Sequence, residues 1–284
     1  MIYISTGGFK DLLPEKSIKI LNKKNIDWIE LSGGRYSKKI SNIIIKNKNN
    51  VFAIHNYFPV PKKSFVLNLA SNNSQIYRKT LNNLKRSINL SNKLKSSYFS
   101  FHAGFLLDPN PNNLGKTLEK IKLQPRKKTF ETFVKRVNEV ADYAKKKNVK
   151  ILIENNVLTK KNLLKFGSNP LLLTGPSEII KFFKKTNNNV GFLLDVGHLK
   201  VSSKTLEFNL FKAHKKLKPI IEGYHLSDNN GLEDSNKSFD KNSWFLKDMK
   251  QNLSYYSIEV YTSDINKLKK LKKIIKKKLI NDSK

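Results

Sequence analysis

Short apolar segments alternate with longer amphipathic segments along the whole chain. Eight of the short segments are rich in Ile, Val, Leu, Phe or Tyr and show little alternation of apolar and polar positions, which is typical of strands buried on both faces. The predicted strands are Ile2–Ser5, Asp27–Leu31, Val51–His55, Tyr98–His102, Lys150–Glu154, Val190–Asp195, Ile221–His225 and Tyr256–Val260.

Helical periodicity marks the segments between these strands. In Ser74–Lys95, apolar residues recur at spacings of four, three and four from Tyr77 to Ile88, which places them on one face of a helix. Thr129–Lys147 has the same pattern, and Pro176 begins another helix, because the missing N–H of proline costs nothing in a first turn. The lysine-rich Ile265–Ile280 would suit a nucleic-acid or membrane surface, but its apolar stripe favours a helix that packs on the strands.

The alternation of strands and helices predicts a parallel sheet. Eight units in 284 residues average about 35 residues each, which fits an α/β fold with a single (β/α)8 TIM barrel. A doubly wound open sheet is the alternative, but Thr6-Gly7-Gly8-Phe9 lacks the G-x-G-x-x-G spacing of its first turn. Because no linker, repeat or low-complexity segment divides the chain, we expect one barrel domain over residues 1–284.

The composition excludes several kinds of site. The chain has no cysteine, so it has no disulfide, thiolate metal site or thiol nucleophile, and a metal ion would have to be bound by His, Asp, Glu or Asn. Uninterrupted apolar runs are far shorter than the roughly 20 residues of a membrane span. The N-terminal segment also lacks the basic and apolar regions of a signal peptide. We therefore expect a cytoplasmic protein with no membrane partner.

The net charge is strongly positive. Lys plus Arg number 55 and Asp plus Glu 22, and a formal charge of +33 favours anionic partners such as nucleic acid or phosphorylated sugars. Only five of the basic residues are arginine, whose planar guanidinium is best suited to phosphate and base contacts. The lysines are spread among many Asn and Ile residues, so we interpret most of the charge as compositional bias at solvated positions.

Six consecutive predicted strands end on or next to an acidic residue or a histidine. With 22 acidic residues and five histidines among 284, such endings are not expected by chance; they are His55, His102, Glu154, Asp195, His225 and Glu259. In a barrel the C-terminal strand ends meet at one mouth, where TIM-barrel enzymes have their active sites. Crowded buried carboxylates need a cation, and a mixed carboxylate and imidazole set suits Mn²⁺, Zn²⁺, Co²⁺ or Fe²⁺. The sequence therefore predicts a divalent metal site.

Two local motifs extend this set. Asp195-Val-Gly-His198 places a histidine three residues after a strand-end carboxylate, and His225-Leu-Ser-Asp228-Asn-Asn-Gly231 continues to Asp234. Taken singly, each of these residues also fits a structural role, as a hydrogen-bonded core histidine, a helix cap or an ion-pair partner.

Other residues are less informative. Tyr57, Phe58 and Phe105 follow the third and fourth strands, where they would either contact a substrate or pack the loops against the rim. His214 lies in the middle of a lysine-rich helix, and we expect it to be a solvated surface residue.

The two motifs resemble those of the xylose isomerase-like TIM-barrel superfamily, which includes sugar isomerases and epimerases and apurinic/apyrimidinic endonucleases of the endonuclease IV type. The resemblance covers essentially the whole chain. For the isomerase and epimerase branch it implies that His198 helps to hold substrate oxygens and that two glutamates, Glu154 and Glu259, act as the acid/base pair. The implied metal ligands are Glu154, Asp195, His225 and Glu259.

The endonuclease branch implies three zinc ions instead. The resemblance assigns His55, His102 and Glu154 to the first ion, the same four ligands as above to the second, and His198 with an Asp-x-His pair to the third. In this sequence that pair reads Asp234-Ser-Asn236, so the third ion would lack a histidine. This departure argues against three-metal hydrolysis of a phosphodiester.

From these residues we predict a divalent-metal-dependent sugar or sugar-phosphate isomerase or epimerase. One or two ions of Mn²⁺, Zn²⁺ or Co²⁺ per chain would stabilise an enediolate, while one glutamate removes a carbon-bound proton and the other returns it. A second ion or the substrate would be held by His55, His102, His198, Asp228 and Asp234. The alternative is an endonuclease IV-like hydrolase of abasic DNA, with nucleic acid as the less favoured partner. The sequence leaves the sugar, the metal and the oligomeric state open.

Overall fold

Eight parallel strands pair in sequence order and close into a barrel. In the computed structural model, which describes residues 1–113 and 115–281, Ile2 to Ile4 of the first strand pair with Tyr256 to Ile258 of the last. The strands are β1 (Ile2–Ser5), β2 (Trp28–Leu31), β3 (Val51–His55), β4 (Tyr98–His102), β5 (Lys150–Glu154), β6 (Val190–Asp195), β7 (Ile221–Leu226) and β8 (Tyr255–Ile258). The predicted fold class is confirmed. The predicted domain, residues 1–284, also includes residues 114 and 282–284, which lie outside the described part.

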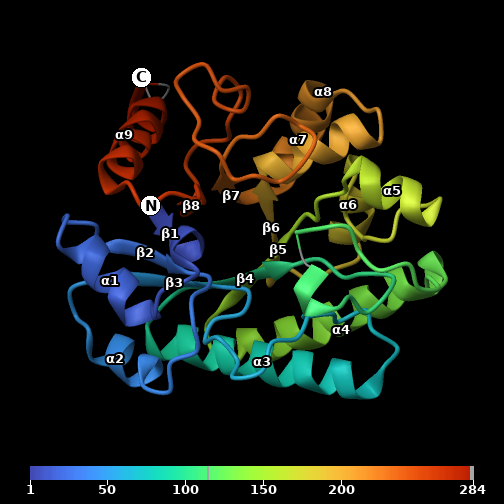
Figure 1. The fold of residues 1–284 in the computed structure, drawn as a ribbon, viewed down its shortest axis with the longest axis horizontal. Coiled ribbons are helices and arrows are strands. Elements are labelled where there is room, and N and C mark those ends of the chain that lie inside the picture. Colours follow the sequence, from blue (N-terminus) through green and yellow to red (C-terminus); the bar gives the residue numbers. More distant parts are fainter. Residues whose placement is uncertain (114, 282–284) are drawn as a thin grey trace.

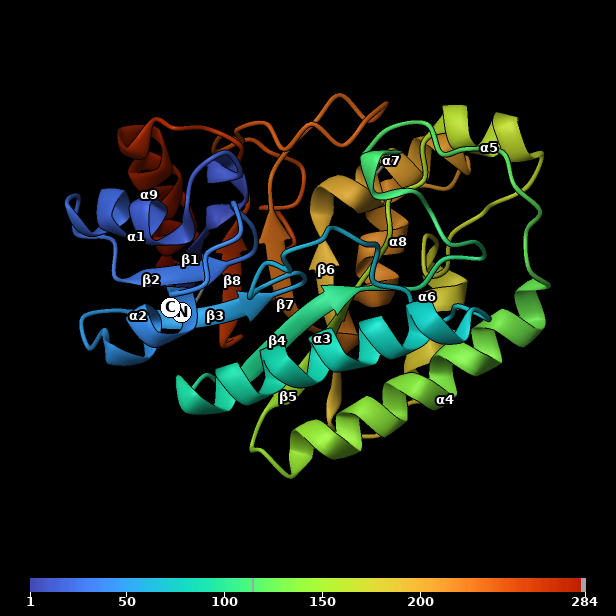
Figure 2. The same cartoon turned by 60° about the horizontal axis from the view of Figure 1, so that its bottom comes forward.

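Helices surround the barrel (Figure 1). The two longest, α3 and α4, lie side by side along one flank, as both views show (Figure 2). The α-helices are α1 (Pro14–Asn22), α2 (Ile40–Lys46), α3 (Ser74–Lys93), α4 (Arg126–Lys145), α5 (Lys160–Phe166), α6 (Pro176–Phe183), α7 (Val196–Thr205), α8 (Leu210–Leu217) and α9 (Ile265–Asn281). Short 3-10 turns, η1 (Thr6–Phe9), η2 (Pro111–Asn113) and η3 (Lys218–Ile220), complete the order. Among the described residues, no helix is both long and apolar enough to cross a membrane.

The last helix packs on the barrel, as its apolar stripe predicts. It contacts β1 and β8. Its buried residues recur at helical spacing; they are Ile265, Leu268, Leu271 and Ile275. Lys267, Lys270 and Lys273 between them are exposed, which is the arrangement expected for an amphipathic helix on a barrel.

A small apolar cluster fills the interior of the barrel. It is distinct from the larger core between strands and helices, and its buried members are Tyr3, Ala53, Leu152, Leu193 and Tyr255. Residues two apart in a strand point to the same face. The residues two positions beyond Ala53, Leu152 and Leu193 therefore form the next interior layer towards the C-terminal strand ends, and that layer is polar.

The expected exposure of His214 is wrong. Its exposed fraction is only 2%, its ring meets that of Trp244 edge-on at 5.7 Å, and its Nε2 lies 3.2 Å from the hydroxyl of Tyr224. His214 follows Ala213 and precedes Leu217 on the buried face of α8. The neighbouring lysines obscured this pattern, because their number suggested a solvated helix although the apolar spacing assigns His214 to the packed stripe.

Burial of His214 predicts a pH dependence of stability. Burial lowers the pKa of His214 below 6.5, Asp248 opposes this change and Lys218 adds to it. Between the folded-state pKa and 6.5 the unfolded chain binds more protons, so the free energy of unfolding decreases as the pH falls through this range. We expect His214→Gln, which keeps a polar group for Tyr224, to reduce the loss of stability between pH 7 and pH 5.5 in urea unfolding. The wild type and the variant share the other four histidines, so these cannot cause a difference between the two. An identical loss of unfolding free energy in the wild type and in His214→Gln would contradict the prediction.

Candidate metal centre

The sheet register brings the strand-end residues together. Asp195 at the end of β6 pairs with His225 of β7, and His102 at the end of β4 pairs with Glu154 at the end of β5. Glu259 directly follows β8, and its backbone N–H donates to the carbonyl of Leu226 at 3.1 Å, which extends the β7–β8 pairing by one residue. These side chains form the polar layer above the apolar cluster inside the barrel.

Four of them meet at one point. Glu154, Asp195, His225 and Glu259 each offer a ligand atom, and these atoms lie within 4.8 Å of one another. The Nδ1 atom of His225 is 2.9 Å from Oε2 of Glu259 and 3.3 Å from Oε2 of Glu154. All four residues are buried. A single ion could therefore contact three carboxylates and one imidazole here.

Unpaired polar atoms show that these residues fit a cation. Both carboxylate oxygens of Glu154, Oδ2 of Asp195 and Nδ1 of His225 are buried without a hydrogen-bond partner. Leaving such atoms unpaired costs free energy unless a ligand satisfies them. The other oxygen of Asp195, Oδ1, accepts the backbone N–H of His198 at 2.7 Å and caps α7, which orients Oδ2. Oxygen and nitrogen donors in this combination suit Mn²⁺, Zn²⁺ or Co²⁺.

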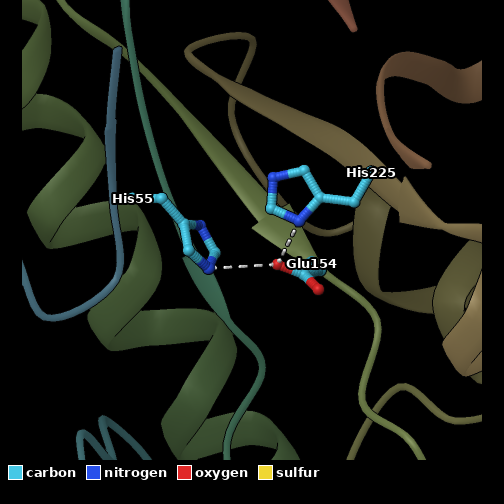
Figure 3. A group of neighbouring side chains, drawn as sticks. All are labelled: His55, Glu154 and His225. Carbon is cyan, nitrogen blue, oxygen red and sulfur yellow. Dashed lines mark ion pairs between the residues drawn. The ribbon is translucent and has the colours of Figure 1, made fainter. Parts of the chain in front are cut away.

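Three further histidines surround Glu154. His55 Nε2 is 3.5 Å from Oε2 of Glu154, His102 Nδ1 is 3.7 Å from Oε1, and His198 Nδ1 is 3.3 Å from Oε1. Figure 3 shows the rings of His55 and His225 both directed at one oxygen of Glu154. Two more groups with ligand-like spacing result, His55–Glu154–His225 and His102–Glu154–His198, so Glu154 belongs to all three groups.

His198 is held by hydrogen bonds on both ring nitrogens. Nδ1 lies 2.8 Å from the carbonyl of Asn155, and Nε2 lies 3.1 Å from the carboxylate of Asp234. Since both partners are acceptors, both nitrogens can donate. Burial alone would lower the pKa of His198, but the charges of Asp195 and Asp234 raise it well above 6.5. His198 is therefore a positively charged group beside the ligand tetrad, which suits stabilisation of negative charge on a substrate oxygen.

The charges of the tetrad depend on one another. Burial opposes ionisation of Glu154, yet the nearby His102 and His225 keep its pKa well below 4.5. Burial also disfavours a charged His225, but the carboxylates of Glu30 and Glu154 raise its pKa well above 6.5. For Asp195, burial dominates and raises the pKa to about 7. Without an ion, His225 and Asp195 thus retain protons near neutral pH.

The structure separates Asp228 from the cluster. Its Oδ1 accepts hydrogen bonds from Lys200 Nζ at 2.6 Å and from the backbone N–H of Asn229 at 2.8 Å, and its backbone pairs with Lys237. Asp228 therefore stabilises the loop after β7. Asp234 does reach the site, through His198, but among the described residues it belongs to no group of His, Asp and Glu with ligand-like spacing.

The aromatic residues after β3 mainly pack their loop. Phe58 is fully buried, and the hydroxyl of Tyr57 accepts the backbone N–H of Leu67 at 3.0 Å. Phe105 is half-buried and forms a backbone bridge with Leu171. Two roles were expected for these aromatic residues, contact with a substrate and packing of the loops. The burial of Phe58 fits packing of the loop.

Sequence reasoning missed Glu30. This residue of β2 is fully buried, its Oε2 lies 2.8 Å from Nε2 of His225, and it accepts the hydroxyl proton of Tyr255. Burial would raise its pKa, but the charge of His225 holds the pKa at about 2. The available signal was a lone charged residue inside the apolar segment Trp28–Leu31, one position before its end.

A cavity near the start of α6 lies away from this cluster. It has a volume of about 600 Å³ and is lined by residues around the start of α6, including Arg126, Glu178 and Phe208. None of the ligand-group residues lines it, and Arg126 is already paired with Glu178 through two hydrogen bonds of 2.9 and 2.7 Å. The strand-end cluster, with its unpaired buried atoms, is therefore the better candidate for chemistry.

Comparison with known proteins identifies the family. The chain belongs to the family described as xylose isomerase-like TIM barrel, whose model matches residues 21–254. No curated protein sequence matches the chain.

Solved structures share the fold over nearly their whole length. A D-tagatose 3-epimerase-like protein is 20% identical, with a TM-score of 0.72 and coverage of 98% of this chain and 96% of that one. The IOLI protein with a binding zinc atom is 14% identical, with a TM-score of 0.66 and coverage of 98% and 97%. The D-psicose 3-epimerase with D-tagatose from Clostridium cellulolyticum H10 is 16% identical, with a TM-score of 0.63 and coverage of 98% and 95%.

Removing one tetrad ligand should weaken metal binding. Asp195→Asn keeps an oxygen to cap α7 but removes the charge. We expect it to lower Mn²⁺ affinity by at least about 100-fold, because even the loss of an outer partner of a ligand typically costs 10- to 100-fold. Isothermal titration calorimetry measures this. The matched control is Asp228→Asn, which changes a carboxylate outside the cluster and should bind as the wild type does. Equal affinities for both variants would rule out the tetrad as the site.

Metal binding should release protons near neutral pH. An ion requires deprotonated ligands, whereas the pKa of His225 lies well above 6.5 and that of Asp195 is about 7 in the metal-free protein. Raising the pH removes this competition, so we expect affinity to increase from pH 6 to pH 8. Titrations in two buffers with different ionisation enthalpies count the released protons, and a count of zero at pH 6.5 would contradict the protonation states described here.

Proposed function

We propose that this protein is a cytoplasmic, divalent-metal-dependent sugar or sugar-phosphate isomerase or epimerase. The observation that carries the proposal is the pair of glutamates, Glu154 and Glu259, whose oxygens lie 3.3 and 2.9 Å from His225 Nδ1 in a buried tetrad with unpaired donor atoms. Membership of the xylose isomerase-like family supports it. Proteins of the same fold named as a D-tagatose 3-epimerase-like protein and a D-psicose 3-epimerase also support it.

The four ligand residues would hold the ion and the glutamates would move the proton. A divalent cation supplies stabilisation of the negative charge that develops on substrate oxygens when a proton leaves the neighbouring carbon. Glu154 is ionised at neutral pH, since its pKa lies well below 4.5, so its carboxylate has a lone pair for a proton. Return of the proton by Glu259 on the opposite face would give epimerisation, and return at the adjacent carbon would give isomerisation.

Some side chains of the cluster are partly exposed, which fits a substrate that enters from the mouth of the barrel. The side chain of His102 is 31% exposed and that of Glu259 11% exposed, whereas Glu154 and His225 have none exposed. His198, which is positively charged and hydrogen-bonded to Asp234, would stabilise negative charge on a substrate oxygen. The formal charge of +33 would also attract a phosphorylated sugar.

Hydrolysis of abasic DNA is the second candidate. It is favoured by the two additional groups around Glu154, which would accommodate more than one ion. Against it, His198 uses both ring nitrogens for Asn155 and Asp234, and Asn236 stands where the resemblance calls for a third-ion histidine. We therefore favour sugar chemistry with one or two ions per chain.

Exchange of a carbon-bound proton with solvent tests the proposal. The wild type loaded with Mn²⁺ is incubated in D₂O with ketopentoses and ketohexoses, free and phosphorylated, and deuterium at the carbon next to the carbonyl is followed by NMR. We expect Glu259→Gln to slow exchange by about 10²- to 10⁴-fold, the range typical of a lost acid/base group. Asp228→Asn, again the matched control, should exchange at the wild-type rate.

The metal content of each variant shows whether slower exchange is due to a missing acid/base group or to a missing ion. Each variant is assayed at saturating Mn²⁺, with bound metal measured by mass spectrometry. Full exchange in both Glu154→Gln and Glu259→Gln would rule out the acid/base assignment. Cleavage of an abasic duplex by wild-type protein carrying three ions, without sugar exchange, would establish the second candidate instead.

A further inference from the structure

A continuous chain of hydrogen bonds lies inside the barrel below the tetrad. We call it the Glu30 network; its members are Glu30 of β2, His55 of β3, Ser100 of β4, His225 of β7 and Tyr255 of β8. Their exposed fractions do not exceed 2%. Five strands that are distant in sequence thus contribute one residue each to a polar cluster that has no contact with solvent.

Each link of the network is a defined contact. His225 Nε2 lies 2.8 Å from Oε2 of Glu30, and the Tyr255 hydroxyl donates to the same oxygen. Ser100 Oγ lies 3.4 Å from the Tyr255 hydroxyl and 3.0 Å from Nδ1 of His55. Glu30 is therefore one bond from His225 and three bonds from His55.

The ionised carboxylate determines the direction of every bond. Glu30 can only accept, so Nε2 of His225 carries a hydrogen and the Tyr255 hydroxyl uses its hydrogen on Glu30. The Tyr255 oxygen is then an acceptor for the Ser100 hydroxyl. With its own hydrogen used, the Ser100 oxygen accepts from Nδ1–H of His55.

The direction of these bonds decides which ring nitrogen of His225 and of His55 carries a lone pair. A neutral histidine has one N–H and one lone pair. In the metal-loaded protein, where a histidine ligand has to be neutral, Nε2–H on His225 and Nδ1–H on His55 leave the lone pairs on Nδ1 of His225 and Nε2 of His55. These are the two atoms that face Oε2 of Glu154, at 3.3 and 3.5 Å (Figure 3).

We propose that Glu30 is a positioning residue that sets the tautomers of both His225 and His55, so that both present a lone pair to the ligand cluster around Glu154. The proposal rests on the metal centre of the proposed function. A carboxylate that accepts the second N–H of a metal-binding histidine also orients the ring and makes it a better donor. In this barrel one carboxylate serves two histidines, one directly and one through Tyr255 and Ser100.

Two variants separate the direct bond between Glu30 and His225 from the indirect link to His55 through Tyr255 and Ser100. Glu30→Gln keeps the shape but removes the charge, and we expect Zn²⁺ affinity to fall by about 10- to 100-fold, as for other outer partners of a ligand. Tyr255→Phe leaves the bond between Glu30 and His225 in place, and we expect Zn²⁺ affinity within about threefold of the wild type but a changed His55 tautomer. Glu222→Gln is the matched control, because Glu222 lies on β7 but pairs with Lys150 outside the site, and it should match the wild type in both measurements.

Histidine ¹⁵N NMR of the Zn²⁺-loaded protein reads the tautomers without an activity assay. In the wild type we expect N–H at Nε2 of His225 and at Nδ1 of His55. In Tyr255→Phe we expect the Nδ1–H form of His55 to lose its dominance while His225 is unchanged. N–H at Nε2 of His55 in the wild type would overturn the proposal, and this measurement needs no variant to fold.

The failure of this proposal differs from the failure of the proposed function. A wild type that binds no Zn²⁺ or Mn²⁺ would refute the metal centre itself. A wild type that binds Zn²⁺, with Glu30→Gln binding equally well or Tyr255→Phe retaining the His55 tautomer, would refute only the positioning role of Glu30.

Discussion

Negative charge buried at one end of the barrel is the constraint on which the site depends. Glu154, Asp195 and Glu259 lie in the interior layer at the C-terminal strand ends and Glu30 lies below them, in an interior where bare carboxylates are costly. Histidines offset this cost only in part, because several oxygens of Glu154 and Asp195 remain without hydrogen-bond partners. A divalent ion would satisfy them together, which explains how a barrel of this size tolerates so much buried charge.

Strand register separates an apolar layer of the barrel interior from the polar layer that contains the candidate metal ligands. Tyr3, Ala53, Leu152, Leu193 and Tyr255 fill the lower interior. Two positions further along the same strands, His55, Glu154 and Asp195 occupy the next layer. Tyr255 joins the layers, since its ring packs in the apolar cluster while its hydroxyl reaches Glu30. The strands therefore hold the candidate ligand atoms, and in TIM-barrel enzymes the loops above such a layer set substrate preference.

Glu154 is the residue on which competing functions converge. It belongs to all three groups with ligand-like spacing, so the same carboxylate would serve a single-ion sugar enzyme or a site with more ions. The difference lies in the residues around it. His198 is engaged by Asn155 and Asp234, and Asp228 is engaged by Lys200. The fold is compatible with several chemistries, and these local hydrogen bonds are what favour one of them.

Local sequence pattern was sufficient for the eight strands and their order, with bounds that differ from the structure by at most two residues, because strands buried on both faces appear as short apolar runs whatever surrounds them. It could not show which residues share an interior layer, since that depends on the register with which the barrel closes. Glu30 was missed because its partners, His225 and Tyr255, are about 200 residues away in sequence. His214 was assigned to the surface because its lysine neighbours dominate the local composition, whereas the packing of α8 buries it. Pattern along a chain records solvent exposure on average, and only the folded barrel decides which atoms meet.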